Sequence, residues 1–253
     1  MFRPRIIPVL LLKNNGLVKS KKFKNFRYIG DPINAVKIFN DLKADELVFL
    51  DIFAGTRNDL ISLHFIKKVG EEANMPFACG GGIRSISQIR DILSAGAEKV
   101  VINTQAVQKP GFVKEASDEF GSSTIIVCMD VKRDFFKRRA VYSKRATEKS
   151  SFEPFEFAQL MEEMGAGEII LQSVDLDGEM QGYDLELLKE ISNALTIPVV
   201  ALGGAGSIAD MKTAVVTTGC NAVAAGSMFV YHGARHGILI NYPDDKTKRN
   251  LFE

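Results

Sequence analysis

The chain has 253 residues, of which 46% are apolar and 25% are charged, and its formal net charge is +1. This composition is typical of a globular protein with a large core, and the length fits one large α/β domain or two smaller ones. The small net charge argues against a protein that binds nucleic acid over its whole surface. No apolar run reaches the roughly 18 residues that a membrane span needs.

Strand-length apolar runs alternate with helical patterns along the whole chain. The runs are rich in Val and Ile and nearly continuous, which is typical of parallel strands buried on both faces. The predicted strands are 5–12, 46–52, 76–80, 98–103, 123–130, 167–173, 198–202 and 221–226. The predicted helices are 33–43, 58–73, 85–95, 111–120, 154–164, 184–195 and 207–217. Several of these helices begin at recognisable N-caps, at Asp31, Ser85 and Ser207.

Eight strands with helices between them predict a (β/α)8 barrel. An open doubly wound sheet is the alternative, but the third strand lacks the nucleotide-binding fingerprint that would favour it. An internal repeat supports the barrel, because the segment 80–104 matches the segment 202–227. We therefore predict one barrel domain over 1–253, made of half-barrels of about 1–120 and 121–253.

The repeat includes the first strand of each half, where the two copies differ. The stretch "RIIPVLLLKNNG" begins at Arg5, and "IIVCMDVKRD" begins at Ile125. Each copy carries a lysine two places past a key position, which is Leu11 in the first copy and Asp130 in the second. Only the second copy can therefore perform acid–base chemistry at this position.

Glycine clusters follow the third strand of each half, and small polar residues end the strand after it. Glycine lets backbone N–H groups approach a phosphate closely, and the helix that follows adds a favourable dipole. One cluster alone could equally be a tight turn, but two at symmetric positions predict two phosphate sites and a ligand with phosphate at both ends. The residues concerned are Gly80, Gly81, Gly82, Asn103, Thr104, Gly203, Gly204, Gly226 and Ser227.

Cysteine and histidine positions indicate no metal site. Three cysteines, Cys79, Cys128 and Cys220, lie within or beside apolar runs and are expected to be buried thiols. His64, His232 and His236 lack metal-ligand spacing and are expected to be structural. We expect no metal and no cofactor. The opening residues show no signal-peptide pattern, so a cytoplasmic location is expected.

Over nearly its whole length the chain resembles the cyclase subunit of imidazole glycerol phosphate synthase (HisF). Shared segments are "DELVFLDI", "GGGIRS", "AGAEKVVIN", "GAGEIIL", "QGYDLEL" and "GGAGS". The resemblance implies a lyase-type synthase of histidine biosynthesis that uses ammonia from a glutaminase partner (HisH-like) on a small phosphorylated substrate. It implies that substrate-binding roles fall to Lys19, Asp51, Asp175, Asp177 and Gly178, together with the glycine clusters, Asn103, Thr104 and Ser227.

Charged residues at the starts of four strands gain a meaning from this resemblance. Arg5, Glu46, Lys99 and Glu168 stand at the N-terminal face of the barrel, where charges usually serve stability or solvation. In the family, the residues at these four positions form the salt-bridged gate of an ammonia channel. We therefore expect the glutaminase to dock at this face.

The resemblance also gives the difference between Leu11 and Asp130 a chemical meaning. In the family, both halves supply an aspartate to the acid–base pair, and Asp130 matches the second. Leu11 stands in place of the first, and a positioned acid or base is worth about 10²–10⁴ in rate. A damaged gene is one explanation, but the gate residues and phosphate sites are all kept. Altered chemistry is therefore the favoured interpretation.

In further differences from the usual HisF pattern, the chain resembles a HisF-like branch. That branch is associated with acetamidino sugar modification in surface-polysaccharide (lipopolysaccharide) synthesis. The chain reads "VYSKRATEKSSFEPFEF" after the fifth strand, and Gln172 and Glu179 occupy positions where the family has threonines. Three hypotheses stay open. The chain is a sugar-amidinating subunit, a true imidazole glycerol phosphate synthase cyclase, or a non-catalytic barrel that docks and activates a glutaminase.

Basic residues crowd the loops after the first and fifth strands. Local positive potential there would steer phosphates to the barrel mouth. Nucleic acid is the competing ligand, but no platform of interleaved aromatic residues supports it. The basic residues are Lys13, Lys19, Lys21, Lys22, Lys24 and Arg27 in the first loop, and Lys132, Arg133, Lys137, Arg138, Arg139, Lys144, Arg145 and Lys149 in the second.

Overall fold

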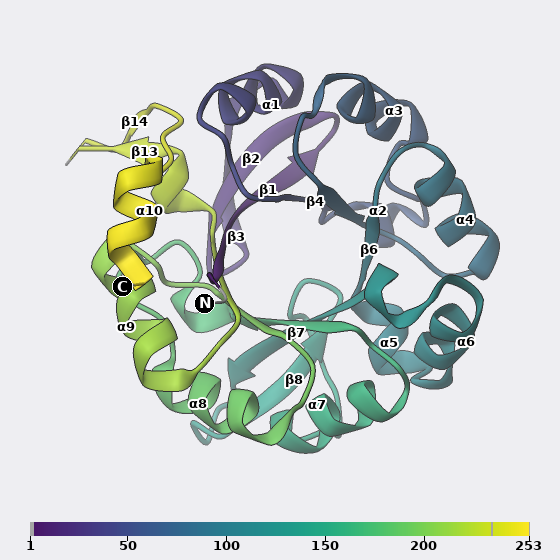
Figure 1. Cartoon of the computed structure of the whole chain (residues 1–253). Coiled ribbons are helices and arrows are strands. Elements are labelled where there is room, and N and C mark those ends of the chain that lie inside the picture. The colour runs from purple at the N-terminus through teal and green to yellow at the C-terminus, as the bar shows by residue number, and fades with distance from the viewer. Residues whose placement is uncertain (1–2, 234, 253) are drawn as a thin grey trace.

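A computed structural model describes residues 3–233 and 235–252, and within them eight parallel strands close into a barrel. Each barrel strand pairs with the next, and the pairs β12–β1 and β7–β10 complete the circle (Figure 1). The (β/α)8 prediction is confirmed, and the open sheet is excluded. The barrel strands are β1 (Arg5–Lys13), β4 (Leu47–Asp51), β5 (Phe77–Gly80), β6 (Lys99–Ile102), β7 (Ile125–Arg133), β10 (Glu168–Ser173), β11 (Val199–Leu202) and β12 (Ala222–Ala225).

Helices surround the barrel on its outside (Figure 1). The three predicted N-caps are confirmed, because Asp31, Ser85 and Ser207 each accept a hydrogen bond from the backbone N–H three residues on. The helices are α1 (Pro32–Asp41), α2 (Ala54–Arg57), α3 (Leu63–Glu72), α4 (Ile86–Ser94), α5 (Thr104–Gln108), α6 (Gly111–Phe120), α7 (Pro154–Glu163), α8 (Leu185–Ala194), α9 (Ile208–Thr218) and α10 (Asp245–Phe252). Short 3-10 turns are η1 (Ser122–Thr124), η2 (Val174–Leu176) and η3 (Ser227–Phe229).

The predicted helix 58–73 is wrong at its start. Asn58 adopts a left-handed conformation with φ of 59° and ends the short helix α2. The following helix begins only after Ser62, whose side chain accepts a hydrogen bond from the Phe65 N–H at 3.2 Å. The helical pattern in the sequence therefore spans both the end of α2 at Asn58 and the start of α3 after Ser62.

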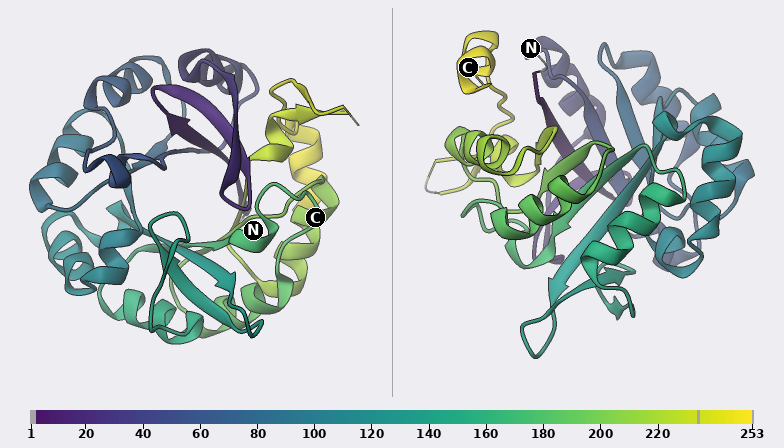
Figure 2. Two further views of the ribbon diagram at one scale, coloured as in Figure 1. Left: turned by 180° about the vertical axis from the view of Figure 1, so that it is seen from behind. Right: turned by 60° about the horizontal axis from the view of Figure 1, so that its bottom comes forward.

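Two barrel strands continue beyond the barrel as antiparallel hairpins, which the sequence patterns did not predict. β1 continues into β2 (Gly16–Lys21) and β3 (Lys24–Gly30). β7 continues into β8 (Arg139–Ser143) and β9 (Glu148–Lys149). The side view in Figure 2 shows the β7–β8 hairpin projecting well beyond the barrel. The chain ends with β13 (Tyr231–His232), β14 (Gly237–Ile238) and α10.

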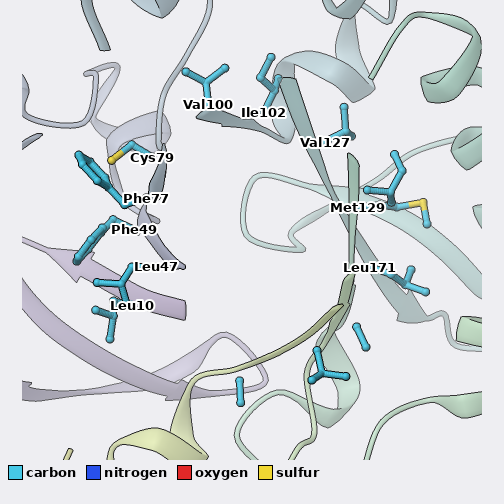
Figure 3. Packing of buried hydrophobic residues seen from close by; sticks show 14 of the residues in the cluster. Leu10, Leu47, Phe49, Phe77, Cys79, Val100, Ile102, Val127, Met129 and Leu171 are labelled. Atoms are coloured by element: carbon cyan, nitrogen blue, oxygen red, sulfur yellow. The ribbon is translucent and has the colours of Figure 1, made fainter. Parts of the chain in front are cut away.

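Apolar side chains fill two layers, one inside the barrel and one between the barrel and the helices. Because side chains alternate along a strand, Val48 points inward while its neighbour Phe49 packs in the outer layer. Figure 3 shows part of the outer layer, where Phe49 and Phe77 pack edge to face with ring centres 6.3 Å apart. The three cysteines are buried and free, as predicted.

The half-barrel duplication stays a prediction from the sequence repeat. Its boundary near residue 120 would fall between α6 and β7. Within the described ranges, no helix is both long and apolar enough to cross a membrane.

Candidate active site at the barrel mouth

A cavity of about 240 Å³ lies at the carboxyl ends of the barrel strands, which is where barrel enzymes place their active sites. Its wall includes both hairpins and the residues that follow several strands. Many of the predicted site residues line it together: Lys19, Asp51, Gly81, Gly82, Asn103, Thr104, Asp130, Asp177, Gly226 and Ser227.

Asp130 is a buried carboxyl group near the end of β7. Burial away from water raises its pKa to about 7, although hydrogen bonds from Cys128 and Asn103 oppose that rise. The Cys128 thiol lies 3.8 Å from one carboxylate oxygen, and the Asn103 side chain also donates to the Cys128 carbonyl at 2.8 Å. A carboxyl group with a pKa near neutrality can either take or give a proton at physiological pH.

Leu11 lines the same cavity from the opposite side of the barrel. Its strand, β1, is separated from β7 by three strands in either direction around the circle. Leu11 pairs in register with Leu50, and both pack on the apolar layer inside the barrel. Asp130 therefore faces an apolar wall.

Asp51 is held in place by its own loop. Its carboxylate accepts hydrogen bonds from the N–H groups of Phe53 and Ala54, both at 3.0 Å, and forms an ion pair with Arg57 at 2.7 Å. This carboxylate closes the turn into α2, so it shapes the cavity wall.

The β2–β3 hairpin folds over the mouth and brings Lys19 into it. The Lys19 ammonium is buried and donates to the Val9 carbonyl at 2.6 Å. Burial lowers its pKa to about 8, although the nearby Asp177 carboxylate opposes this. Asp177 also pins the hairpin, because it accepts hydrogen bonds from the Ser20 hydroxyl at 2.9 Å and the Phe23 N–H at 3.3 Å. Burial raises the pKa of Asp177 as well.

The first glycine cluster borders the cavity. Gly82 has a φ of +72°, and a Cβ atom there would lie 1.9 Å from the Asp59 carbonyl oxygen. Glycine is therefore required by the packing of the loop before α3, independently of any ligand. The loop in turn presents the backbone of Gly81 and Gly82 to the cavity.

The second cluster is placed differently from the prediction. Gly203 and Gly204 do not line the cavity, because other loops cover them. The Gly204 carbonyl accepts a hydrogen bond from the Gly182 N–H at 2.8 Å, and a Cβ atom at Gly204 would lie 2.0 Å from the Gly182 oxygen. At this end, Gly226 and Ser227 border the cavity instead.

Asp175 and Gly178 also lie outside the cavity wall. Asp175 accepts a hydrogen bond from the Arg133 N–H at 2.8 Å, which ties the loop after β10 to the end of β7. A Cβ atom at Gly178 would lie 2.3 Å from the Ser20 carbonyl oxygen. Both residues therefore support the walls of the cavity from behind.

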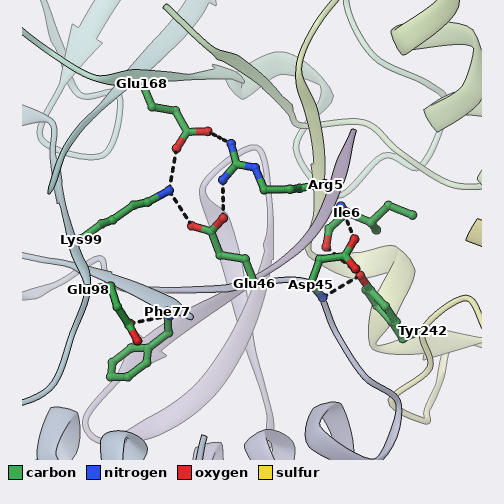
Figure 4. Close-up of polar contacts among 9 residues, drawn as sticks. All are labelled: Arg5, Ile6, Asp45, Glu46, Phe77, Glu98, Lys99, Glu168 and Tyr242. Atoms are coloured by element: carbon green, nitrogen blue, oxygen red, sulfur yellow. Dashed lines mark hydrogen bonds and ion pairs between the residues drawn. The ribbon is translucent and has the colours of Figure 1, made fainter. Parts of the chain in front are cut away.

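The four charged residues at the N-terminal face meet in an alternating ring (Figure 4). The Arg5 guanidinium bonds both Glu46 and Glu168. The Lys99 ammonium completes the ring at 3.4 Å from Glu46 and 3.2 Å from Glu168. The carboxylate side chains are only 4% and 7% exposed, whereas those of the two cations are about one quarter exposed.

Residues 5–235 match the family model described as histidine biosynthesis protein. A protein of Leptospira interrogans named putative imidazole glycerol phosphate synthase subunit HisF is 43% identical over the full length of both chains. The chain belongs to the HisF family.

Other HisF relatives cover nearly as much of the chain. A Pseudomonas aeruginosa protein named putative imidazole glycerol phosphate synthase subunit hisF2 is 44% identical over 96% of this chain and 97% of its own. The HisF protein of Alkaliphilus metalliredigens, named imidazole glycerol phosphate synthase subunit without qualification, is 41% identical over 92% of each chain.

Gln172 sits in the wall of this HisF-family cavity beside Asp130, with which it pairs in register on the neighbouring strand. Its amide is buried and donates to the Ser173 carbonyl at 3.2 Å. Glu179 lies farther out, where Lys22 approaches it at 3.6 Å.

Two residues that line the cavity, Phe23 and Arg84, were not predicted from the sequence, although Arg84 lies within the shared "GGGIRS" segment.

Many of the basic loop residues are engaged with carboxylates, so the positive potential at the mouth is smaller than the sequence suggested. Asp134 bonds Lys149 at 2.8 Å and Arg138 at 3.4 Å, and Asp184 bonds Arg139 at 2.8 Å. Among the basic residues of the two loops, those that line the cavity are Lys19, Lys144 and Arg145.

Proposed function

We propose that this HisF-family chain is the ammonia-using synthase subunit of a glutamine amidotransferase complex. Its substrate is a phosphate-bearing sugar, whose N-acetyl amide becomes an amidine during surface-polysaccharide synthesis. The observation that carries this proposal is that Asp130 and the apolar Leu11 line opposite sides of the cavity. That arrangement lacks the second carboxylate of the cyclase chemistry, while the four-charge ring is complete.

Ammonia enters from the opposite face in this proposal. A glutaminase subunit docked at the N-terminal face releases ammonia beside Arg5, Glu46, Lys99 and Glu168. Those residues act as the gate of a path along the barrel axis. Buried ion pairs are weak stabilisers, so a ring built on two nearly buried carboxylates is better explained by a role in transport than by fold stability.

Chemistry then takes place in the cavity. Ammonia adds to the carbon of an activated amide, and the amide oxygen leaves together with its activating group. Asp130 takes the proton that the nitrogen loses, which its pKa of about 7 permits at physiological pH. Asn103 orients Asp130, while the backbone of Gly81 and Gly82, together with Thr104, holds one phosphate. Lys19, Gly226 and Ser227 hold the far end of the substrate.

A second candidate is the cyclase reaction of histidine biosynthesis, which the names of the relatives favour. The relatives in Leptospira interrogans and Pseudomonas aeruginosa, aligned over 100% and 96% of this chain, carry the word putative in that name, whereas the Alkaliphilus metalliredigens relative with the unqualified name is aligned over 92%. The third candidate, a non-catalytic barrel that activates a glutaminase, is favoured only by the absence of a carboxylate at Leu11. Each candidate places the protein in the cytoplasm with its partner.

Mass spectrometry of the products decides between these candidates. The chain is reconstituted with its glutaminase and supplied with glutamine, in one series with the bisphosphate ribonucleotide and in another with activated N-acetyl sugar phosphates. We expect ammonia nitrogen from labelled glutamine in an amidine product and little imidazole product. Imidazole formation at a normal rate would overturn the altered substrate, and labelled ammonia without any product would favour the non-catalytic barrel.

A further inference from the structure

Phe53, which follows β4 between the cavity-lining residues Ile52 and Gly55, carries two cations on its ring. The Arg145 guanidinium lies 4.4 Å from the ring centre, and the Lys13 ammonium lies 4.8 Å from it. Phe26 packs edge to face against Phe53 at 5.0 Å and is also approached by Lys13. Attraction between a cation and an aromatic face holds such groups in place without neutralising their charge.

Neither cation has a carboxylate partner in the part of the chain that the structure describes. Arg145 also has a buried Nε atom without a hydrogen-bond partner there, which normally costs free energy. This differs from the other arginines of the same loop, because Arg138 and Arg139 both bond carboxylates. Two unneutralised cations around one ring create a local site for an anion.

The backbone that carries Arg145 is strained. Lys144, Arg145 and Ala146 have φ values of 50°, 59° and 57°, which makes three consecutive left-handed residues without a glycine. Side chains disfavour the left-handed conformation because Cβ crowds the backbone there, so the surrounding structure must enforce this turn.

The turn is enforced by local hydrogen bonds and by packing. The Thr147 hydroxyl donates to the Lys144 carbonyl at 2.7 Å, and the Thr147 N–H donates to Ser143 at 3.2 Å. Ala146 is buried in a small apolar cluster with Tyr142 and with Phe23 of the other hairpin. These contacts fix the direction of Arg145, whose side chain lines the cavity.

The position of the turn connects it to one end of the cavity. The Lys144 N–H donates to the Thr104 hydroxyl at 3.3 Å, and Thr104 belongs to the phosphate site proposed above with Gly82. We propose that Arg145 and Lys13, held on Phe53, form a subsite at the cavity rim that takes a second phosphoryl group adjoining the one at Gly82 and Thr104. The substrate class is then a diphosphate ester, an inference that rests on the proposed function for its first phosphate.

Calorimetric titration of the purified chain with inorganic pyrophosphate and with inorganic phosphate tests this subsite. We expect pyrophosphate to bind about 10–100-fold more tightly than phosphate, because charge-assisted hydrogen bonds from an arginine are each worth that much. Arg145→Gln should remove this advantage and leave phosphate affinity within about twofold. Arg145→Lys should restore only part of it, because lysine lacks the planar fork.

Arg138→Gln is the matched control, since Arg138 also lies on a phenylalanine ring, Phe136, at 5.4 Å in the same loop. It should bind both anions as wild type does. Lys13→Gln reports on the same subsite from another strand if Arg145→Gln fails to fold. The subsite is wrong if pyrophosphate has no advantage in the wild-type chain, or if Arg145→Gln and Lys13→Gln behave like Arg138→Gln. Thr104→Val separates the two proposals, because phosphate binding that ignores Thr104 would refute the first phosphate site itself.

Discussion

Asp130 and Leu11 determine which side of the cavity carries an acid–base group. The sequence predicted both positions, because each lies at a fixed place in a repeated strand pattern. The sequence could not show that the Asp130 pKa would rise to about 7, since that depends on burial by the whole cavity. For the same reason it placed Gly203 and Gly204 at the cavity, although their glycine requirement comes from the approach of Gly182 and Ser173.

Replacing Asp130 with asparagine should stabilise the folded chain at alkaline pH. The folded carboxyl group has a pKa of about 7 against an ordinary 3.8, so the folded state binds a proton more readily than the unfolded state. The contribution of this carboxyl group to the free energy of unfolding is favourable below about pH 4 and is lost as the pH rises to about 7. Above about pH 7 the contribution does not change further. Asp130→Asn should therefore gain about 2–4 kcal/mol at pH 8 and nothing at pH 4. Urea unfolding at both pH values measures this, with the exposed Asp91→Asn as a control.

Leu11→Asp tests whether one missing carboxylate explains the altered site. We expect little cyclase activity from this variant when it is given ammonia and the bisphosphate ribonucleotide. The new carboxylate would be desolvated beside Leu50 and would face the carboxylate of Asp130, so its pKa should rise. Catalytic groups that act as a unit are also strongly non-additive, and Gln172 has changed as well. A large gain in turnover would mean that the cavity still fits the histidine-pathway intermediate.

The barrel strands were predictable from the sequence, whereas the two hairpins were not. Continuous Val- and Ile-rich runs are interpretable without tertiary information, and the ends of the predicted strands lie close to those of β4, β10 and β11. The strands β2 and β8 are rich in charged and small residues, so their composition resembles that of solvated loops. Their strand structure comes from pairing with β1 and β7, which no local pattern reveals.

The β2–β3 hairpin should loosen when its contact with the loop after β10 is weakened. Ser20→Ala removes the hydroxyl that donates to the buried Asp177 carboxylate at 2.9 Å. A hydrogen bond to a charged group contributes about 1.5–3 kcal/mol, so we expect amide exchange across 16–30 to quicken about tenfold or more. Hydrogen-exchange mass spectrometry measures this change. Ser192→Ala serves as the control, because the Ser192 hydroxyl has no hydrogen-bond partner in the described residues. Equal protection in both variants would contradict the pinning role of Asp177.

The barrel separates two polar regions by an apolar interior. The charged ring lies at one face, the cavity with Asp130 lies at the other, and the layer between them consists of residues such as Val48, Ile170 and Val200. A small neutral molecule such as ammonia crosses an apolar layer more readily than an ion does, since only the ion must be desolvated at high cost. The fold therefore suits a protein that receives ammonia at one end and uses it at the other.

Lys99→Ala should uncouple the two ends in the reconstituted complex with a glutaminase. The variant opens the ring on one side and leaves Arg5 as the one ion-pair partner of Glu46 and Glu168 among the described residues. We expect more glutamine to be hydrolysed for each product molecule, because ammonia escapes before it reaches the cavity. Product formation from external ammonium salts should stay within about twofold of wild type, since the ring is remote from Asp130. Parallel assays of glutamate and product measure the ratio, with Lys114→Ala as the control, because Lys114 pairs with Asp118 on the outer surface of α6. If the ratio is the same in Lys99→Ala, Lys114→Ala and wild type, the ring does not gate ammonia.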